Sequence, residues 1–314
     1  MSKWAILPRR WRVKQEAARH AAAIADILET PPIVPRTDGV VLFSMIGTAV
    51  LLPYLVAVKS LWHQLGRGRI ALLDDGTLTG ADKAILAHHC GDPEILSIAR
   101  VDTTGFPKGG CWERFLSILD RRGSEFWIQL DSDTVTLGPV PEVAAALALN
   151  RSFTLLGGLD AAKPDGTGRM LPLGDFARAF YPDGPADGHI QTRVESRMGQ
   201  ITTRPDWRYI RGCAGFAGFA AGGPGRPLAA AFLAQMEKLV GPQDIATWGT
   251  EQIASNFHIA NEPRAAALPY ARFMNYWAED WAAGTSFVHF VGTHRYDNGA
   301  YEAASRLAIA QLKV

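Results

Sequence analysis

The sequence predicts an α/β fold in which a mostly parallel central sheet is flanked by helices. Between residues 38 and 135, short apolar segments alternate with helix-like segments of about 10–15 residues, which is the pattern of βαβ units. The chain has 314 residues, of which 47% are hydrophobic and 20% charged. This length and composition provide a large buried core and exclude a disordered or fibrous chain.

The first expected strand lies in Gly39–Val58, a run of twenty uncharged residues that is long enough to span a membrane. The run divides in two. Residues 40–45 are apolar and β-branched, as in a buried strand, whereas apolar residues recur every three or four positions from Leu51 to Leu65, as in an amphipathic helix. Pro53 is tolerated in the first turn of such a helix but would break a spanning helix. We therefore expect strand, loop and helix.

The remaining segments continue the alternation and then become less regular. Residues 157–188 are rich in Gly, Pro and Asp, which predicts a long mobile loop or lid. The segment GCAGFAGFAAGG at 212–223 has regularly spaced glycines. The other expected elements are strands at 69–75, 94–101, 125–130 and 286–290, and helices at 79–90, 110–122, 226–240, 245–260 and after 299.

Charge and cysteine content exclude some classes of protein. Lys and Arg number 32 and Asp and Glu 31, so the net charge of +1 argues against a protein that coats nucleic acid. The three cysteines, Cys90, Cys111 and Cys213, form no zinc-binding pattern, and so sparse a set suits the reducing cytoplasm. The first fifteen residues lack the apolar core of a signal peptide, so we expect a cytoplasmic protein.

Residues 1–37 are expected to form a basic, helical N-terminal extension, with a helix at Val13–Leu28. The first twenty residues hold six Lys and Arg against one acid, Glu16, and include Trp4 and Trp11. Such a segment can bind an acidic partner, or it can contact the anionic surface of a membrane and hold the protein peripherally at its inner face. It can equally be a solvated basic extension.

The most informative local feature is Asp131-Ser132-Asp133, directly after the apolar strand FWIQL. Residues i and i+2 of an extended chain point to the same side, so the two carboxylates lie side by side and repel each other. A hard divalent cation, Mn²⁺ or Mg²⁺, relieves this repulsion. The alternative is a surface turn in which the acids only cap the backbone.

The segment LDSDTVTLGPVPE resembles the strand, DxD triplet and turn of nucleotide-sugar glycosyltransferases with the GT-A fold, most closely family 8. The resemblance covers about residues 38–300. It implies one catalytic domain over 38–314, with a nucleotide-binding half at 38–135 and a sugar and acceptor half at 136–314. It also implies a UDP-sugar donor, a carbohydrate, lipid or protein acceptor, and no nucleic-acid partner.

A second motif, HFVGTHR at 289–295, is similar to the HxxGxxK box of the same family. The resemblance implies that His289 is the third metal ligand and that Gly292 and Arg295 hold the diphosphate. Arginine can bind a phosphate through two hydrogen bonds, so its presence in place of lysine is chemically acceptable. The family's Pro-Trp after the lysine is absent. A lone histidine in SFVHF can also be a buried, hydrogen-bonded core residue.

Further contacts to the donor are expected at the ends of the first two strands. Ser44, Gly47 and Thr48 are candidates for the base and ribose, as is Asp75, with Asp74 as its alternative. Both acids are equally ordinary as turn or capping residues. Arg114, on the helix before the DxD strand, and Ser132, inside the triplet, complete the expected donor contacts.

The segment TWGTEQIASNF at 247–257 resembles the family's acidic-Gln segment that faces the transferred sugar. The resemblance implies that Glu251 and Gln252 contact the sugar hydroxyls or the reacting carbon. Glu251 can instead be a first-turn acid that interacts with the helix dipole. GCAGFAG resembles the strand beneath the donor sugar, although close packing alone would explain its glycines.

Two other functions fit part of the pattern. Asp131, Asp133 and Val135 match the DxDx[TV] signature of haloacid-dehalogenase phosphatases, with Asp131 as nucleophile. That family places the motif on its first strand, and the later acidic pair it needs is missing because Ala179 stands where the second acid belongs. A non-catalytic module that binds nucleotide sugars is the other alternative, and turnover of a donor would distinguish it from an enzyme.

Overall fold

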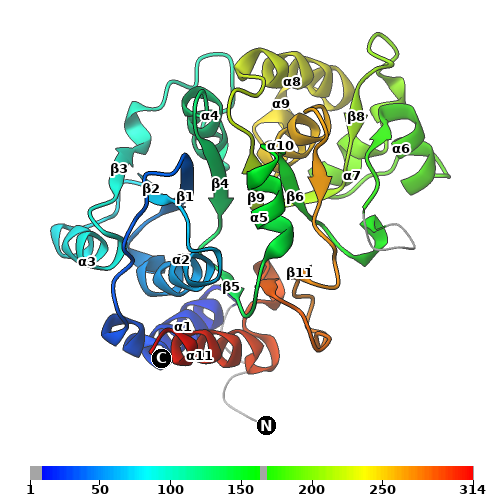
Figure 1. Ribbon diagram of the computed structural model, residues 1–314. Coiled ribbons are helices and arrows are strands. Elements are labelled where there is room, and N and C mark those ends of the chain that lie inside the picture. Colours follow the sequence, from blue (N-terminus) through cyan, green and yellow to red (C-terminus); the bar gives the residue numbers. More distant parts are fainter. Residues whose placement is uncertain (1–8, 163–167, 314) are drawn as a thin grey trace.

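The computed structural model describes residues 9–162 and 168–313. In this part of the chain, seven strands form a central sheet in the order β10-β6-β9-β4-β1-β2-β3 (Figure 1). Neighbouring strands are parallel except for β9, which is antiparallel to β4 and β6, so the expected mostly parallel sheet is confirmed. The strands are β1 (Val40–Ile46), β2 (Arg69–Asp74), β3 (Glu94–Ser97), β4 (Phe126–Leu130), β6 (Phe153–Leu156), β9 (Gly212–Phe219) and β10 (Ala266–Ala267).

Helices cover both faces of this sheet, as the apolar character of β1 requires. Val40 and Leu42 of β1 belong to the core on one face, and Val41 and Phe43 to the core on the other. The helices of the first face include α2 (Leu51–Leu65), α3 (Gly80–Cys90), α5 (Pro141–Ala148) and α11 (Ala300–Leu312), and those of the second include α4 (Trp112–Arg121), α8 (Arg226–Val240) and α10 (Thr250–Ala260).

The uncharged run Gly39–Val58 forms strand β1, a short loop and helix α2, as expected. Pro53 lies in the first turn of α2. Among the helices of the described residues, none combines the length and apolar character that a membrane span needs.

A second, three-stranded sheet lies beside the first and carries part of the site. It consists of β11 (Phe273–Asn275), β12 (Phe287–His289) and β5 (Thr134–Thr136), with β12 in the middle. β12 is parallel to β11 and antiparallel to β5. This arrangement joins the chain after the DxD triplet to two strands near the C-terminus.

Three sequence-based expectations need correction. The segment 157–188 is not only a loop, because it contains β7 (Leu171–Pro172) and α6 (Leu173–Phe180), which buries Leu173, Phe176 and Ala177 on one side. Residues 163–167 of that segment lie outside the described residues. The expected strand 94–101 ends at Ser97. The helix expected at 245–260 begins only at Thr250, because residues 246–249, which include Gly249 with a φ of +103°, separate α10 from the short helix α9 (Pro242–Ile245).

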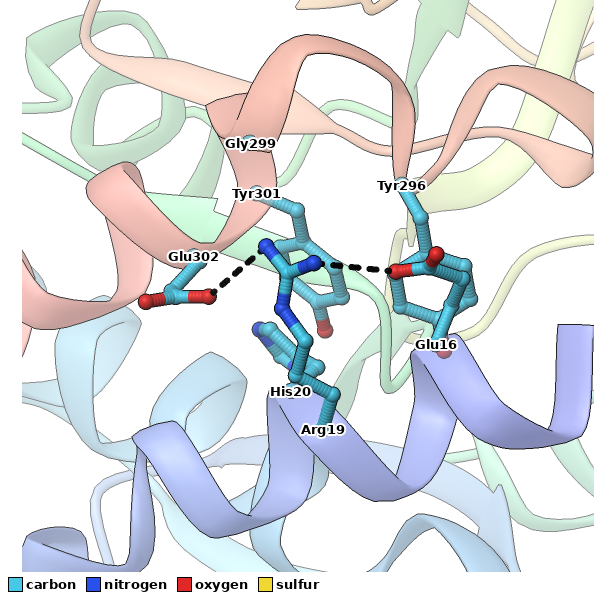
Figure 2. A pocket seen from close by; sticks show the side chains of 7 residues that line it. All are labelled: Glu16, Arg19, His20, Tyr296, Gly299, Tyr301 and Glu302. Atoms are coloured by element: carbon cyan, nitrogen blue, oxygen red, sulfur yellow. Dashed lines mark ion pairs between the residues drawn. The ribbon is translucent and has the colours of Figure 1, made fainter. Parts of the chain in front are cut away.

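The N-terminal helix packs against the C-terminal one. α1 (Arg9–Ala23) begins before the expected Val13 and is followed by the short helix η2 (Ala25–Glu29), and α1 lies beside α11 (Figure 1). Figure 2 shows His20 of α1 against Tyr301, with ring centroids 3.9 Å apart, and Arg19 between Glu16 and Glu302. Lys3 and Trp4 lie outside the described residues.

Candidate active site

The structure brings together the three side chains that the sequence singled out for metal binding. Asp131 and Asp133 follow β4, His289 ends β12, and one ligand atom of each lies within 4.8 Å of the others. His289 Nε2 is 3.3 Å from Asp133 Oδ1 and 3.8 Å from Asp131 Oδ2. The antiparallel pairing of β5 with β12 causes this approach, because it sets Thr134 opposite His289. Strand pairing thus joins residues that are about 150 positions apart in the sequence.

Asn275 at the end of β11 orients the imidazole of His289. The Asn275 amide nitrogen donates to the carbonyls of Leu156 and Gly157, so its Oδ1 faces the ring, 2.8 Å from His289 Nδ1. A carbonyl oxygen only accepts, which means that Nδ1 donates the hydrogen. Nε2, on the side of the two carboxylates, is then the nitrogen that can bind a metal ion.

Gly215 in β9 makes room for the same ring. A Cβ atom on Gly215 would lie 2.3 Å from His289 Cε1, closer than side chains can approach. The neighbouring backbone also fixes the triplet, since the Asp131 N–H donates to the carbonyl of Gly215. The glycine-spaced strand therefore serves the site as well as the packing of the sheet.

Positive charge surrounds the carboxylate pair. Arg295 forms an ion pair with Asp133, and Arg114 of α4 forms one with Asp131. Burial alone would raise the pKa of Asp133, but His289 and Arg295 outweigh this effect and lower the pKa to about 2. Two carboxylates beside an oriented imidazole are a donor set that fits Mn²⁺ or Mg²⁺.

Glu251 lies in the first turn of α10, and its side chain is only 4% exposed. Burial raises the pKa of Glu251 to about 7, although the guanidinium of Arg114, 3.6 Å away, opposes the shift. Glu251 Oε1 accepts no hydrogen bond from the described residues. A carboxyl group that is close to half protonated at neutral pH is suited to binding a hydroxyl group or holding a proton.

Gln252 is held by both ends of its amide. Its Oε1 accepts from the Ala214 N–H at 3.1 Å, and its Nε2 donates to Gln191 Oε1 at 3.1 Å. One hydrogen of the Nε2 group remains available. The amide is therefore a hydrogen-bond donor that is fixed in position next to Ala214 of β9.

All these groups face one cavity of about 730 Å³. Of the residues expected at the site, the cavity is lined by Arg114, Asp131, Asp133, Glu251, Gln252, His289, Gly292 and Arg295. No bulky group lies over Gly292, since a Cβ there would have no atom within 4 Å among the described residues. This places the two predicted motifs and the acidic-Gln segment around a common space.

The other expected donor contacts do not line this cavity. Ser44 is buried in the sheet, where its hydroxyl donates to the carbonyl of Leu130. Gly47, Thr48 and Asp75 lie together beyond β1 and β2, where Thr48 and Asp75 both hydrogen-bond to Thr77. A nucleotide base over these strand ends remains a prediction. Ser132 also lies outside the cavity lining, and its carbonyl accepts from Tyr301.

A second polar cluster in the cavity was not expected from the sequence. The carboxylate of Glu195, at the end of α7 (Ile190–Glu195), is fully buried and accepts hydrogen bonds from Tyr181, Tyr209 and Gln191. Arg211 binds the same carboxylate at 2.6 Å and Asp160 at 2.8 Å. These residues come from separate segments without a recognisable motif. Asn275 was missed for the same reason.

The structure is similar to solved glycosyltransferases. A structure of the galactosyltransferase LgtC, in complex with donor and acceptor sugar analogues, aligns with a TM-score of 0.53 and 12% identity over 86% of this chain and 95% of LgtC. The bifunctional glycosyltransferase WbbM aligns with a TM-score of 0.47 and 14% identity over 89% of this chain and 51% of WbbM. No protein-family model and no curated protein matches the sequence. The likeness to LgtC shows the GT-A fold that the sequence predicted.

Proposed function

We propose that this chain is a metal-dependent glycosyltransferase that moves a sugar from a nucleotide diphosphate, with a UDP-sugar as the first candidate donor. One observation carries the proposal: Asp131, Asp133 and His289 converge on the wall of a large cavity, next to an arginine, in a GT-A fold. Transfer of a sugar from a nucleotide diphosphate needs positive charge at this position, because negative charge grows on the departing diphosphate.

The chain's own residues have separate tasks at this end of the cavity. When bound by Asp131, Asp133 and His289 Nε2, Mn²⁺ or Mg²⁺ supplies charge neutralisation for the diphosphate. Arg295 can bind a phosphate oxygen, since it lines the cavity beside the metal-binding residues. Gly292 leaves space for the phosphates to approach the backbone.

Glu251 and Gln252 are the candidates for contact with the transferred sugar. Gln252 presents its remaining N–H as a fixed donor, and the unbonded Oε1 of Glu251 can accept from a sugar hydroxyl. Arg114 links this pair to the metal end, because it binds both Asp131 and Glu251.

We also expect a cytoplasmic location, which cell fractionation would test.

The proposal is tested by calorimetry of UDP binding with and without Mn²⁺. We expect binding that depends on Mn²⁺ in the wild type and none measurable in Asp133→Asn, which keeps the shape of the side chain but removes its charge. Asp175→Asn is the matched control, because Asp175 is an exposed carboxylate of α6 outside the cavity lining. Equal affinity in Asp133→Asn and the wild type would contradict the metal site.

Turnover distinguishes an enzyme from a binding module. We expect slow, Mn²⁺-dependent hydrolysis of at least one UDP-sugar in the absence of an acceptor, detected as free sugar. If UDP bound with Mn²⁺ but no donor from a broad panel of nucleotide sugars were consumed with or without acceptors, the chain would be a binding module.

A further inference from the structure

One part of the cavity wall, which we call the tryptophan end, differs in composition from the metal-binding residues. Two tryptophans, Trp248 and Trp277, line the cavity and remain 70% and 48% exposed. Trp248 precedes α10 and Trp277 follows β11, so two different segments of the C-terminal third supply the rings. Exposing such large apolar rings is unfavourable in water, and two of them in one cavity indicate a ligand that covers them.

A continuous band of polar residues connects the two rings. His189 lies beside Trp248, with ring centroids 6.2 Å apart, and accepts from the Gln191 N–H. Gln191 donates to Glu195 at 2.8 Å, and Glu195 binds Arg211. Arg211 in turn binds Asp160, which follows Gly158; a Cβ atom on Gly158 would lie 4.0 Å from Trp277 Nε1.

The charge of this band argues against an anionic ligand. Arg211 is neutralised by Glu195 and Asp160 together, so the two carboxylates outnumber the one guanidinium. A phosphorylated or carboxylated molecule would have to compete with both acids for Arg211. The polar character of the band also argues against an acyl chain, which would leave these hydrogen-bonding groups desolvated.

We propose that this end of the cavity binds an uncharged saccharide, the acceptor of the transfer proposed above. A sugar ring has an apolar C–H face that can stack on Trp248 or Trp277 and a rim of hydroxyls that can bind Asp160 and Gln191. Asp160 is suited to this role because its side chain is 63% exposed and Arg211 fixes one of its oxygens. The exposed residues thus supply the contacts, and the buried Glu195 holds them in place.

This inference rests on the proposed function for the reaction itself. An acceptor hydroxyl oxygen forms a bond to the anomeric carbon of the donor sugar, and the bond from that carbon to the diphosphate breaks. The electron pair of the broken bond stays on the diphosphate. The hydroxyl proton passes to the departing diphosphate or to water, so atoms and charges balance.

Binding of the acceptor can be measured without the donor. We would record saturation-transfer NMR on the full chain with neutral mono- and disaccharides, with phosphorylated sugars, and with a peptide containing Ser, Thr and Tyr. We expect signals from at least one neutral saccharide, and a loss of affinity of about 10-fold or more in Trp248→Ala and in Asp160→Asn. Trp11→Ala is the matched control, because Trp11 is 53% exposed on α1, outside the cavity lining.

The outcomes separate this proposal from the proposed function. Unchanged saccharide binding in Trp248→Ala and Asp160→Asn would overturn the saccharide site. Binding of only phosphorylated sugars, of only the peptide, or of no probe would also overturn it. Mn²⁺-dependent UDP affinity, measured on the same samples, reports on the donor site alone. Its absence in the wild type would overturn the donor assignment whatever the saccharides do.

Discussion

The two ends of the cavity are held in place by different means. At the metal end, backbone pairing among β5, β12 and β11 sets the positions of Asp133, His289 and Asn275. At the tryptophan end, side chains hold one another, with the buried carboxylate of Glu195 at the centre and Arg211 bound to it. The metal end should therefore tolerate loss of one side chain without unfolding, whereas the tryptophan end couples its shape to the stability of the fold.

The largest expected effect is on stability, from Glu195→Gln. Loss of this charge leaves Arg211 with Asp160 as its remaining acid, and breaking a buried ion pair costs about 3–5 kcal/mol. Denaturant unfolding should show this loss, while Mn²⁺-dependent UDP affinity stays at the wild-type value. Asp175→Asn, which breaks an exposed pair, should cost less than about 1 kcal/mol. Comparable losses of stability in the two variants would show that the buried pair of Glu195 stabilises the fold no more than an exposed pair does.

The next effect is at the metal end. His289→Ala removes a metal ligand, so the affinity for Mn²⁺ and UDP should fall by about 100-fold or more, close to 3 kcal/mol. The melting temperature should change far less than in Glu195→Gln, because strand pairing and not the imidazole holds this region. Calorimetry and thermal unfolding check the two statements. His88→Ala, an exposed histidine of α3, is the control. An affinity unchanged from the wild type would exclude His289 as a ligand.

Removal of the residue that orients the imidazole should have a smaller effect. Asn275→Ala removes the partner of His289 Nδ1, and loss of such a partner typically reduces metal affinity by about 10-fold or somewhat more. Asn275→Asp keeps an oxygen acceptor for Nδ1–H and should recover part of the affinity. If the two variants bound Mn²⁺ and UDP equally, the role of Asn275 would be confined to its bonds with Leu156 and Gly157.

The smallest effect concerns Glu251, between the two ends. Its pKa of about 7 in the folded protein lies above its ordinary value of 4.5, so the folded state binds more protons between these pH values. Stability of the metal-free protein should therefore fall as pH rises, by about 1 kcal/mol between pH 6 and pH 8 from this group. Chemical unfolding in chelator should show that Glu251→Gln lacks this part of the decline. If the free energy of unfolding depended on pH equally in the variant and the wild type, Glu251 would not be the group that titrates.

The sequence indicated the metal end because its chemistry lies in short motifs. Asp131 and Asp133 follow a strand, so their position predicted a paired carboxylate site, whereas the role of His289 was implied by the resemblance of HFVGTHR to a family motif. The motifs meet because β5, which follows the triplet, pairs antiparallel with β12, which carries His289. The pairing of β5 with β12 was not predicted, because strands of three residues carry too little pattern.

The tryptophan end could not be predicted by the same reasoning. Glu195, Arg211 and Asp160 are separated by loops, and their contacts depend on how those loops fold. Helix α6 was missed because glycines and prolines surround a single amphipathic stretch from Leu173 to Phe180. The donor contacts expected at Gly47, Thr48 and Asp75 followed the general rule that ligands bind beyond the carboxyl ends of parallel strands. This rule indicates the edge of the sheet but not which side chains contact the ligand.

The central claim is that Asp131, Asp133 and His289 bind one divalent ion beside a nucleotide diphosphate. A crystal structure of the full chain grown with Mn²⁺ and UDP tests it most directly, through the anomalous signal of manganese. We predict one strong peak in contact with both carboxylates and with His289 Nε2, bridged to the phosphates. A peak bound elsewhere, or bound UDP without manganese at these residues, would contradict the claim.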